Sequence, residues 1–153
     1  MFKVLVSSCL LGEPVRYDGK SKGVSHQILD KWQSQGRIVS FCPEVAGGLP
    51  TPRPAAEISH SGRVLTIDSI DVTDAFLLGA QKALSLCLKN KIKFAILKEG
   101  SPSCGRNEIY DGSHQNRKIS GMGLTAELLE RNGIKVFSEF QIEVMDLIVN
   151  KSS

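Results

Sequence analysis

The sequence predicts an α/β fold: an open, mainly parallel, Rossmann-like sheet with flanking helices and an inserted hairpin. Short, β-branched apolar runs typical of fully buried strands alternate with longer segments whose apolar residues recur at helical spacing. Strands that alternate with helices are typical of parallel sheets. The 153 residues suit one core, and no linker or repeat interrupts them, so we expect a single domain over residues 1–153.

The first half of the chain is expected to hold two strands of the sheet, a helix and the hairpin. These are strands at Phe2–Val6 and Arg37–Phe41, a helix at Val24–Trp32, and a hairpin at Glu57–Ile67 that turns at Ser61-Gly62. Residues 43–54 hold two glycines and four prolines. We therefore expect no regular structure in that segment.

The second half is expected to complete the sheet with two more strands. The pattern predicts strands at Lys93–Leu97 and Ile134–Phe137, helices after Thr73 and at Gly123–Asn132, and a last helix ending near Asn150. Thr73 is the expected N-cap of its helix. Ser138 and Gln141 have the spacing of a capping box for the last one.

Three of the four cysteines follow expected strands. Cys9 and Cys42 come after the first two, and Cys104 lies in the polar loop after the third. Because the carboxyl ends of parallel strands line the ligand crevice of such sheets, we expect these thiols to converge. Cys87 lies within an apolar helical pattern and is expected to be a buried small hydrophobic residue.

Three converging thiolates suit a soft metal centre. A structural zinc site needs a fourth protein ligand, and no histidine pairs closely with a cysteine in this sequence. Three ligands leave one position open, as a catalytic centre requires. Spacing alone leaves the alternative of three unrelated loop cysteines equally open.

The loops add candidate site residues, each with a plainer alternative. Glu44 is a candidate general base, or else a solvated charge or a salt-bridge partner of Arg53. Ser101 and Ser103 offer hydroxyls to a ligand, or else cap the local backbone. Gly47 and Gly48 are candidates because glycine permits the close approach of a bulky or flat ligand. The last candidate is the segment Arg16-Tyr17-Asp18, which either forms a wall that recognises a polar ring or is a simple turn.

Composition narrows the classes of partner and compartment. A net charge of +3 is too small to indicate nucleic-acid binding. No apolar stretch reaches the roughly 18 residues of a membrane span, and the apolar segment before Cys9 is too short for a signal peptide. We expect a cytoplasmic protein without a membrane partner, in which four cysteines serve a metal or catalysis instead of disulfides.

Three motifs, Cys9–Gly19, Cys42–Arg53 and Lys98–Gly105, resemble the three signatures of the bacterial DUF523 family, which includes the thiouracil desulfurases. The resemblance covers almost the whole chain. It implies a [4Fe-4S] cluster held by Cys9, Cys42 and Cys104, with the fourth iron free to take the sulfur of a thiolated base. It also implies catalytic roles for Glu44 and Ser101. Aerobic handling is expected to strip such an exposed cluster.

The resemblance implies a non-redox desulfurase of the lyase or hydrolase type, acting on a small thiolated base such as 2-thiouracil by hydrolytic C–S cleavage. We expect this chain to lack the second domain that longer relatives use with thiolated tRNA, so there is no strong case for a nucleic-acid partner. The alternative is a metal-binding or sulfur-handling module without desulfurase activity. A nucleotide-binding regulator lacks its own motif here. The physiological substrate and the oligomeric state stay open.

Overall fold

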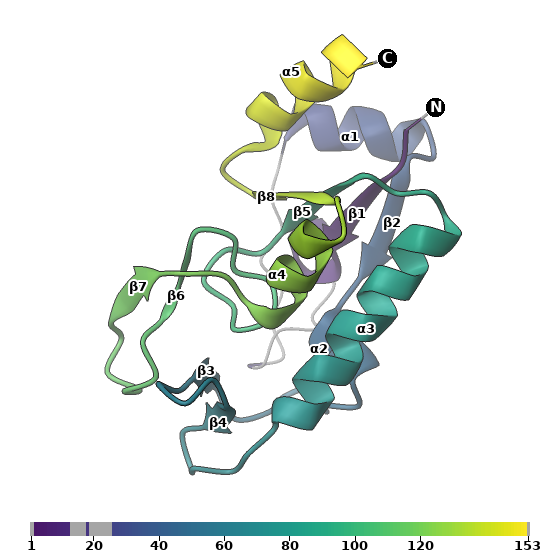
Figure 1. The fold of residues 1–153 in the computed structure, drawn as a ribbon. Coiled ribbons are helices and arrows are strands. Elements are labelled where there is room, and N and C mark those ends of the chain that lie inside the picture. Colours follow the sequence, from purple (N-terminus) through teal and green to yellow (C-terminus); the bar gives the residue numbers. More distant parts are fainter. Residues whose placement is uncertain (1, 13–17, 19–25, 153) are drawn as a thin grey trace.

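The central sheet of the protein has four short parallel strands in the order β2–β1–β5–β8 (Figure 1). The computed structural model describes residues 2–12, 18 and 26–152. The strands are β1 (Val4–Ser7), β2 (Ile38–Phe41), β5 (Phe94–Leu97) and β8 (Lys135–Ser138). The predicted α/β fold with a parallel sheet is therefore confirmed.

Two pairs of helices cover the two faces of this sheet (Figure 1). They are α1 (Gln27–Ser34) with α5 (Ile142–Ser152) on one face, and α3 (Thr73–Lys89) with α4 (Leu124–Arg131) on the other. Strand β1 is buried along its whole length because successive side chains enter opposite layers. Val4 and Val6 pack with α1 and α5, whereas Leu5 packs with α3 and α4.

The order of the strands opens a crevice between β1 and β5. From β1 the chain proceeds to its neighbour β2, and from β5 it proceeds to β8 on the opposite side. Ligands of open parallel sheets bind at such a switch point, beyond the carboxyl ends of the strands. The sheet therefore offers one favoured place for a site.

Two antiparallel ribbons lie outside the sheet. The first joins β3 (Ala56–Ile58) to β4 (Val64–Thr66), which confirms the predicted hairpin. The second, β6 (Glu108–Tyr110) with β7 (Lys118–Ser120), was not predicted. Strands β3 and β6 contact each other, so the ribbons form one unit beside the sheet.

A short helix, α2 (Pro43–Ala46), occupies the segment for which no regular structure was expected. Proline is tolerated in the first turn of a helix because that turn has no partner for its N–H groups, and the glycine-rich remainder of the segment is irregular. Helix α2 lies directly on α3. A Cβ atom on Gly47 would overlap the carbonyl oxygen of Ala75, and one on Gly79 would overlap that of Pro43.

The helix caps differ in part from those predicted. Asp71 accepts the N–H of Thr73 at 2.9 Å, while the Thr73 hydroxyl accepts the N–H of Val64 at 2.8 Å. Thr73 is therefore the first residue of α3 and not its cap, because its hydroxyl is used by the hairpin. At α5, Gln141 accepts the Ser138 N–H at 3.0 Å, which is one half of the predicted capping box.

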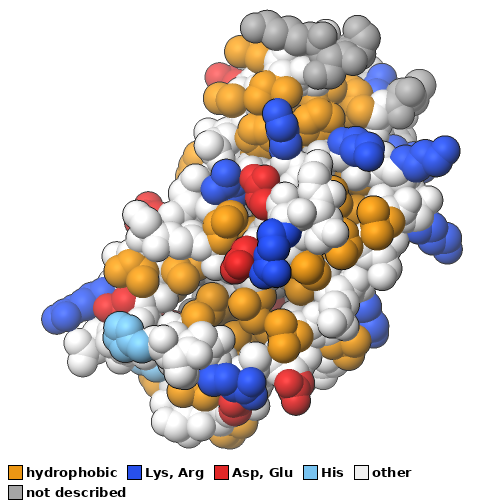
Figure 2. All heavy atoms as spheres, in the orientation of Figure 1, with side chains coloured by type: hydrophobic (Ala, Val, Ile, Leu, Met, Phe, Trp, Pro, Cys, Tyr) orange, Lys and Arg blue, Asp and Glu red, His pale blue; other side chains and the backbone are white. Residues whose placement is uncertain are grey.

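The surface shows no continuous basic area on the face drawn in Figure 2, where Lys and Arg side chains are dispersed among hydrophobic and uncharged atoms. Within the described residues, no helix has both the length and the apolar character needed to cross a bilayer.

Candidate active site

A cavity of about 250 Å³ lies at the carboxyl ends of β1, β2 and β5. It brings together all three cysteines that follow strands. Its described lining includes Ser7, Cys9, Phe41, Cys42, Glu44, Arg53, Glu57, Lys98, Glu99, Ser101, Cys104, Tyr110 and Lys118.

Each cysteine is placed by the element that follows its strand. Cys9 lies in a 3₁₀ turn, η1 (Ser8–Leu11), directly after β1 and is 8% exposed. Cys42 is half-buried at the N-cap position of α2, immediately after β2. Cys104 is 5% exposed in the loop after β5. The predicted convergence of the three side chains on one cavity is present.

Burial makes the thiolate forms of Cys42 and Cys104 unfavourable in the absence of a positive partner. Desolvation raises the pKa of Cys104 well above its usual range, opposed by a hydrogen bond from Ser7 and reinforced by Cys42, Glu44 and Cys9. Desolvation likewise raises the pKa of Cys42. A bound metal centre reverses this balance, because its positive charge stabilises coordinated thiolates.

The three thiols are a donor set that an iron–sulfur cluster takes. Among the described residues, no group of three or more His, Cys, Asp and Glu side chains is arranged to hold one metal ion. A [4Fe-4S] cluster binds its cysteines at separate corners, so its ligands stand further apart around one cavity. Cys9, Cys42 and Cys104 line one cavity, and soft sulfur ligands suit such a cluster.

Glu44 lies beside the cysteines on α2, with its side chain 18% exposed. Its Oε1 atom is 3.3 Å from Nε of Arg53, so the salt bridge considered as an alternative exists. Its Oε2 atom accepts the Ser101 hydroxyl at 3.4 Å. Burial raises the pKa of Glu44 in spite of the opposing effects of Arg53 and Ser101. A carboxylate with a raised pKa in a cavity is a suitable proton acceptor.

The hydroxyl of Ser101 has a defined direction. Its oxygen accepts the backbone N–H groups of Ser103 and Cys104 at 3.0 and 3.1 Å. Both acceptor positions are thereby used, which leaves the hydroxyl hydrogen for Glu44. Ser103 is different: its hydroxyl bonds Thr125 at 2.8 Å, and it is not among the described residues that line the cavity.

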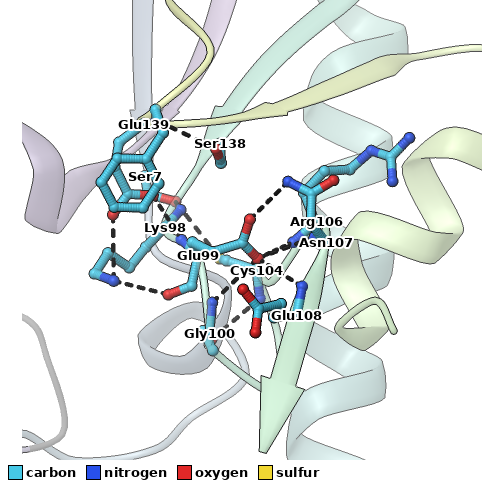
Figure 3. A network of polar contacts seen from close by, with 12 residues as sticks. Ser7, Lys98, Glu99, Gly100, Cys104, Arg106, Asn107, Glu108, Ser138 and Glu139 are labelled. Atoms are coloured by element: carbon cyan, nitrogen blue, oxygen red, sulfur yellow. Dashed lines mark hydrogen bonds and ion pairs between the residues drawn. The ribbon is translucent and has the colours of Figure 1, made fainter. Parts of the chain in front are cut away.

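The partly buried carboxylate of Glu99 holds the loop that carries Ser101 and Cys104 (Figure 3). Oε1 of Glu99 accepts the N–H groups of Arg106, Asn107 and Glu108 at 2.9–3.1 Å. Desolvation raises the pKa of Glu99, but these hydrogen bonds outweigh it and leave the pKa lowered.

The same loop is tied to β8. The backbone N–H of Glu99 donates to Glu139 at 2.7 Å, and the Lys98 ammonium lies 3.2 Å from the second oxygen of that carboxylate (Figure 3). The third loop is thus fixed by charge-assisted hydrogen bonds, which are stronger than neutral ones.

The other predicted ligand-binding residues have different positions. Arg16 and Tyr17 lie outside the described residues. Asp18, Gly47 and Gly48 are not among the described residues of the cavity wall. Gly47 instead permits the backbone contact of α2 with α3.

Several wall residues were not predicted from the sequence. Glu57, Tyr110 and Lys118 come from the two ribbons, and Ser7 and Lys98 come from strand ends. The Asp-Gly pair at 111–112, between two short β-prone runs, is a hairpin signal that would have pointed to the second ribbon. Ser7 carries no comparable signal.

Cys87 is fully buried in α3, as predicted. It packs with Leu5, Ala95 and other apolar residues, and desolvation raises its pKa to about 11. It is a protonated, unreactive core residue at neutral pH.

The fold and the cavity define an α/β protein with the cysteine set of a metal-dependent enzyme, next to a paired carboxylate and serine. Comparison with known proteins specifies the family. A family model described as 2-thiouracil desulfurase matches residues 4–141, and the chain belongs to this family.

Two relatives extend the comparison. A solved structure titled [4Fe-4S]-dependent thiouracil desulfidase TudS (DUF523Vcz) is 52% identical, with a TM-score of 0.96 over 98% of this chain and 99% of that one. The uncharacterized protein YbbK of Bacillus subtilis (strain 168) is 39% identical in an alignment 148 residues long, which covers 91% of this chain and 97% of the relative.

Proposed function

We propose that this protein is a [4Fe-4S]-dependent desulfidase that removes the sulfur of a thiolated nucleobase such as 2-thiouracil by hydrolytic C–S cleavage, without net redox change. The observation that carries the proposal is the convergence of Cys9, Cys42 and Cys104 on one cavity with the Glu44–Ser101 pair. The 52% identity to a thiouracil desulfidase over nearly the full chain supports it.

In this proposal Cys9, Cys42 and Cys104 hold the cluster. When bound by these three residues, the cluster would supply one iron open to substrate, with Lewis acidity toward a thiocarbonyl sulfur. The thiols lie at the ends of three different strands, so the sheet itself fixes their spacing.

Glu44 is the proposed general base for the attacking water. Its carboxylate faces the cavity between Arg53 and Ser101, and its raised pKa makes it a better proton acceptor than an exposed glutamate. Arg53 stabilises the buried negative charge of the Glu44 carboxylate before Glu44 takes the proton from water. Ser101 donates to the carboxylate and thereby fixes its orientation, or passes its hydrogen to the substrate when a ring enters.

The polar ribbon residues Glu57, Tyr110 and Lys118 form the wall that would contact the rest of the ring. We propose a free or singly substituted small molecule as substrate, since the cavity of about 250 Å³ is small. We also place the protein in the cytoplasm, where its four free cysteines stay reduced.

The deciding experiment is anaerobic reconstitution of the full chain with iron and sulfide, followed by metal analysis and a 2-thiouracil assay on the same sample. We expect one [4Fe-4S] cluster per chain and release of uracil and sulfide. A cluster without turnover would make the protein a sulfur-handling or metal-binding module. Stoichiometric zinc in place of iron would exclude the proposed chemistry.

A further inference from the structure

Ser7 connects the central strand β1 to the third cysteine. It is the last residue of β1, it is 3% exposed, and its side chain lines the cavity. Its hydroxyl oxygen lies 3.5 Å from Sγ of Cys104, although the two residues are 97 positions apart in the sequence. The contact of a buried hydroxyl with a buried thiol in a candidate cluster site requires a physical explanation.

A second contact of the Ser7 hydroxyl leaves its hydrogen available for this hydrogen bond. The backbone N–H of Lys98 donates to the same Ser7 oxygen at 3.0 Å. The oxygen therefore serves as the acceptor for Lys98, and its own hydrogen is free to point at the sulfur. A sulfur bound to iron has no hydrogen and can only accept, so the contact keeps the same direction when metal is present.

We propose that Ser7 is a positioning residue that donates a hydrogen bond to the coordinated Cys104 thiolate and so makes the bound cluster more electron-poor. This inference rests on the proposed function, because it requires the cluster that Cys9, Cys42 and Cys104 would hold. It assigns a role to a residue outside the three cysteine motifs.

The physical consequence follows from charge. A hydrogen bond to a cysteine sulfur withdraws electron density from it, so the sulfur donates less to iron. The more negative, reduced state of the cluster gains more from this bond than the oxidised state, which raises the reduction potential. The same loss of electron density makes an open iron a stronger Lewis acid toward an incoming sulfur.

Geometry also gives the bond a mechanical effect. Through Lys98 and Cys104, Ser7 joins the end of β1 to the beginning and the end of the third loop. If Ser7 had a purely structural role, this connection between β1 and the third loop would be its only effect. The two roles are separable, because only a hydrogen bond to sulfur changes the electronic state of the cluster.

The test compares Ser7→Ala, Ser7→Thr and a matched control, Ser103→Ala. Ser103 is also a buried serine, 1% exposed and adjacent to Cys104, but its hydroxyl bonds Thr125. Each protein is reconstituted anaerobically, iron and sulfide are counted, and the midpoint potential is measured by redox titration monitored by electron paramagnetic resonance.

We expect Ser7→Ala to lower the midpoint potential by an amount equal to about a three- to tenfold change in the reduction equilibrium, about 59 mV for tenfold in a one-electron couple. Ser7→Thr keeps the hydroxyl and should restore the wild-type potential, and Ser103→Ala should leave the potential unchanged. Equal potentials in wild type and Ser7→Ala, or an equal decrease in Ser103→Ala, would overturn the inference.

If Ser7→Ala does not retain iron, Ser7→Thr decides the matter. A threonine variant with a full cluster at the wild-type potential supports the hydroxyl's role, whereas one that also loses its cluster reduces Ser7 to a packing residue. Failure of the wild-type chain to bind any cluster is a different result, since it contradicts the proposed function itself.

Discussion

The two sides of the cavity differ in origin and in burial. The cysteine wall, made of Ser7, Cys9, Cys42 and Cys104, comes from the ends of parallel strands and is mostly buried. The ribbon wall, made of Glu57, Tyr110 and Lys118, comes from the antiparallel ribbons, and Lys118 is exposed. This difference indicates that the sheet fixes the positions of the reactive groups, whereas the two ribbons can determine which substrate binds.

Hydrogen bonds of Glu57 connect the two ribbons that form the ribbon wall. Glu57 of β3 accepts the N–H groups of Gly112 and His114 at 2.9 and 3.2 Å, which ties the first ribbon to the loop of the second. Lys118 lies 5.5 Å from the ring centre of Tyr110. Neither ribbon contributes a cysteine, so changes there should alter binding of substrate and leave the metal site intact.

The largest effect is expected from Cys104→Ser in the cysteine wall. Removing one of three sulfur ligands should abolish cluster retention and desulfuration, because no other described cysteine lines the cavity to replace it. Metal analysis after anaerobic reconstitution measures this. The matched control is Cys87→Ser, which makes the same change in the core and should keep its iron; iron loss in this variant alone would mean that the ligand set is wrong.

Glu44→Gln is expected to lower kcat by about 10²–10⁴-fold with the cluster retained, because the proton acceptor is lost while the sulfur ligands remain. Steady-state kinetics and cluster absorbance are measured on the same sample. Glu108→Gln changes an exposed carboxylate on β6 and serves as control. Normal turnover in a fully loaded Glu44→Gln enzyme would remove Glu44 from the mechanism.

Glu99→Gln should lower the free energy of unfolding by about 1–2 kcal/mol at neutral pH, because charge-assisted hydrogen bonds to the third loop are weakened. The folded-state pKa of Glu99 is lowered, so its contribution is complete above the ordinary glutamate value of about 4.3 and is lost as pH falls through the lowered value.

Denaturant unfolding at pH 7 and at pH 3 checks this expectation. The difference in the free energy of unfolding between wild type and Glu99→Gln should be smaller at pH 3 than at pH 7. The control Glu127→Gln, which changes an exposed carboxylate, should have little effect on this free energy at either pH. A difference that grows on acidification would contradict the role of the ionised carboxylate.

The smallest effect is expected in the ribbon wall. Lys118→Ala should raise KM for thiouracil about two- to tenfold and leave kcat near wild type, since one polar contact to the ring is lost and no reacting group changes. Lys135→Ala, on the exposed side of β8, is the control. A loss in kcat with unchanged KM would show that the two walls are not functionally separate.

The sheet and the meeting of the cysteines were predictable from the sequence because both follow from strand order. Buried runs such as Val4–Ser7 and Phe94–Leu97 identify strands, and a parallel sheet places all their carboxyl ends together. Glu44 was found because it lies two residues from a cysteine. These inferences need only local pattern and one rule of topology.

The second ribbon and Ser7 could not be predicted from buried runs and strand order. β6 and β7 are three residues each, too short for a periodic signal, and their placement depends on the contact of β3 with β6. The contact of Ser7 with Cys104 joins residues that are 97 positions apart in the sequence. Thr73 showed the opposite error: local capping rules were overridden by a tertiary hydrogen bond to Val64.

The direct contact of α2 with α3 has a consequence for which substitutions the enzyme tolerates. No side chain separates the two helices at Gly79, so even the methyl group of an alanine would push α2 outward and displace Cys42 with it. None of the described cavity residues belongs to α3. Inactivating substitutions are therefore to be expected on a helix that supplies none of the described cavity residues, while its exposed Leu77 and Leu88 should tolerate substitution.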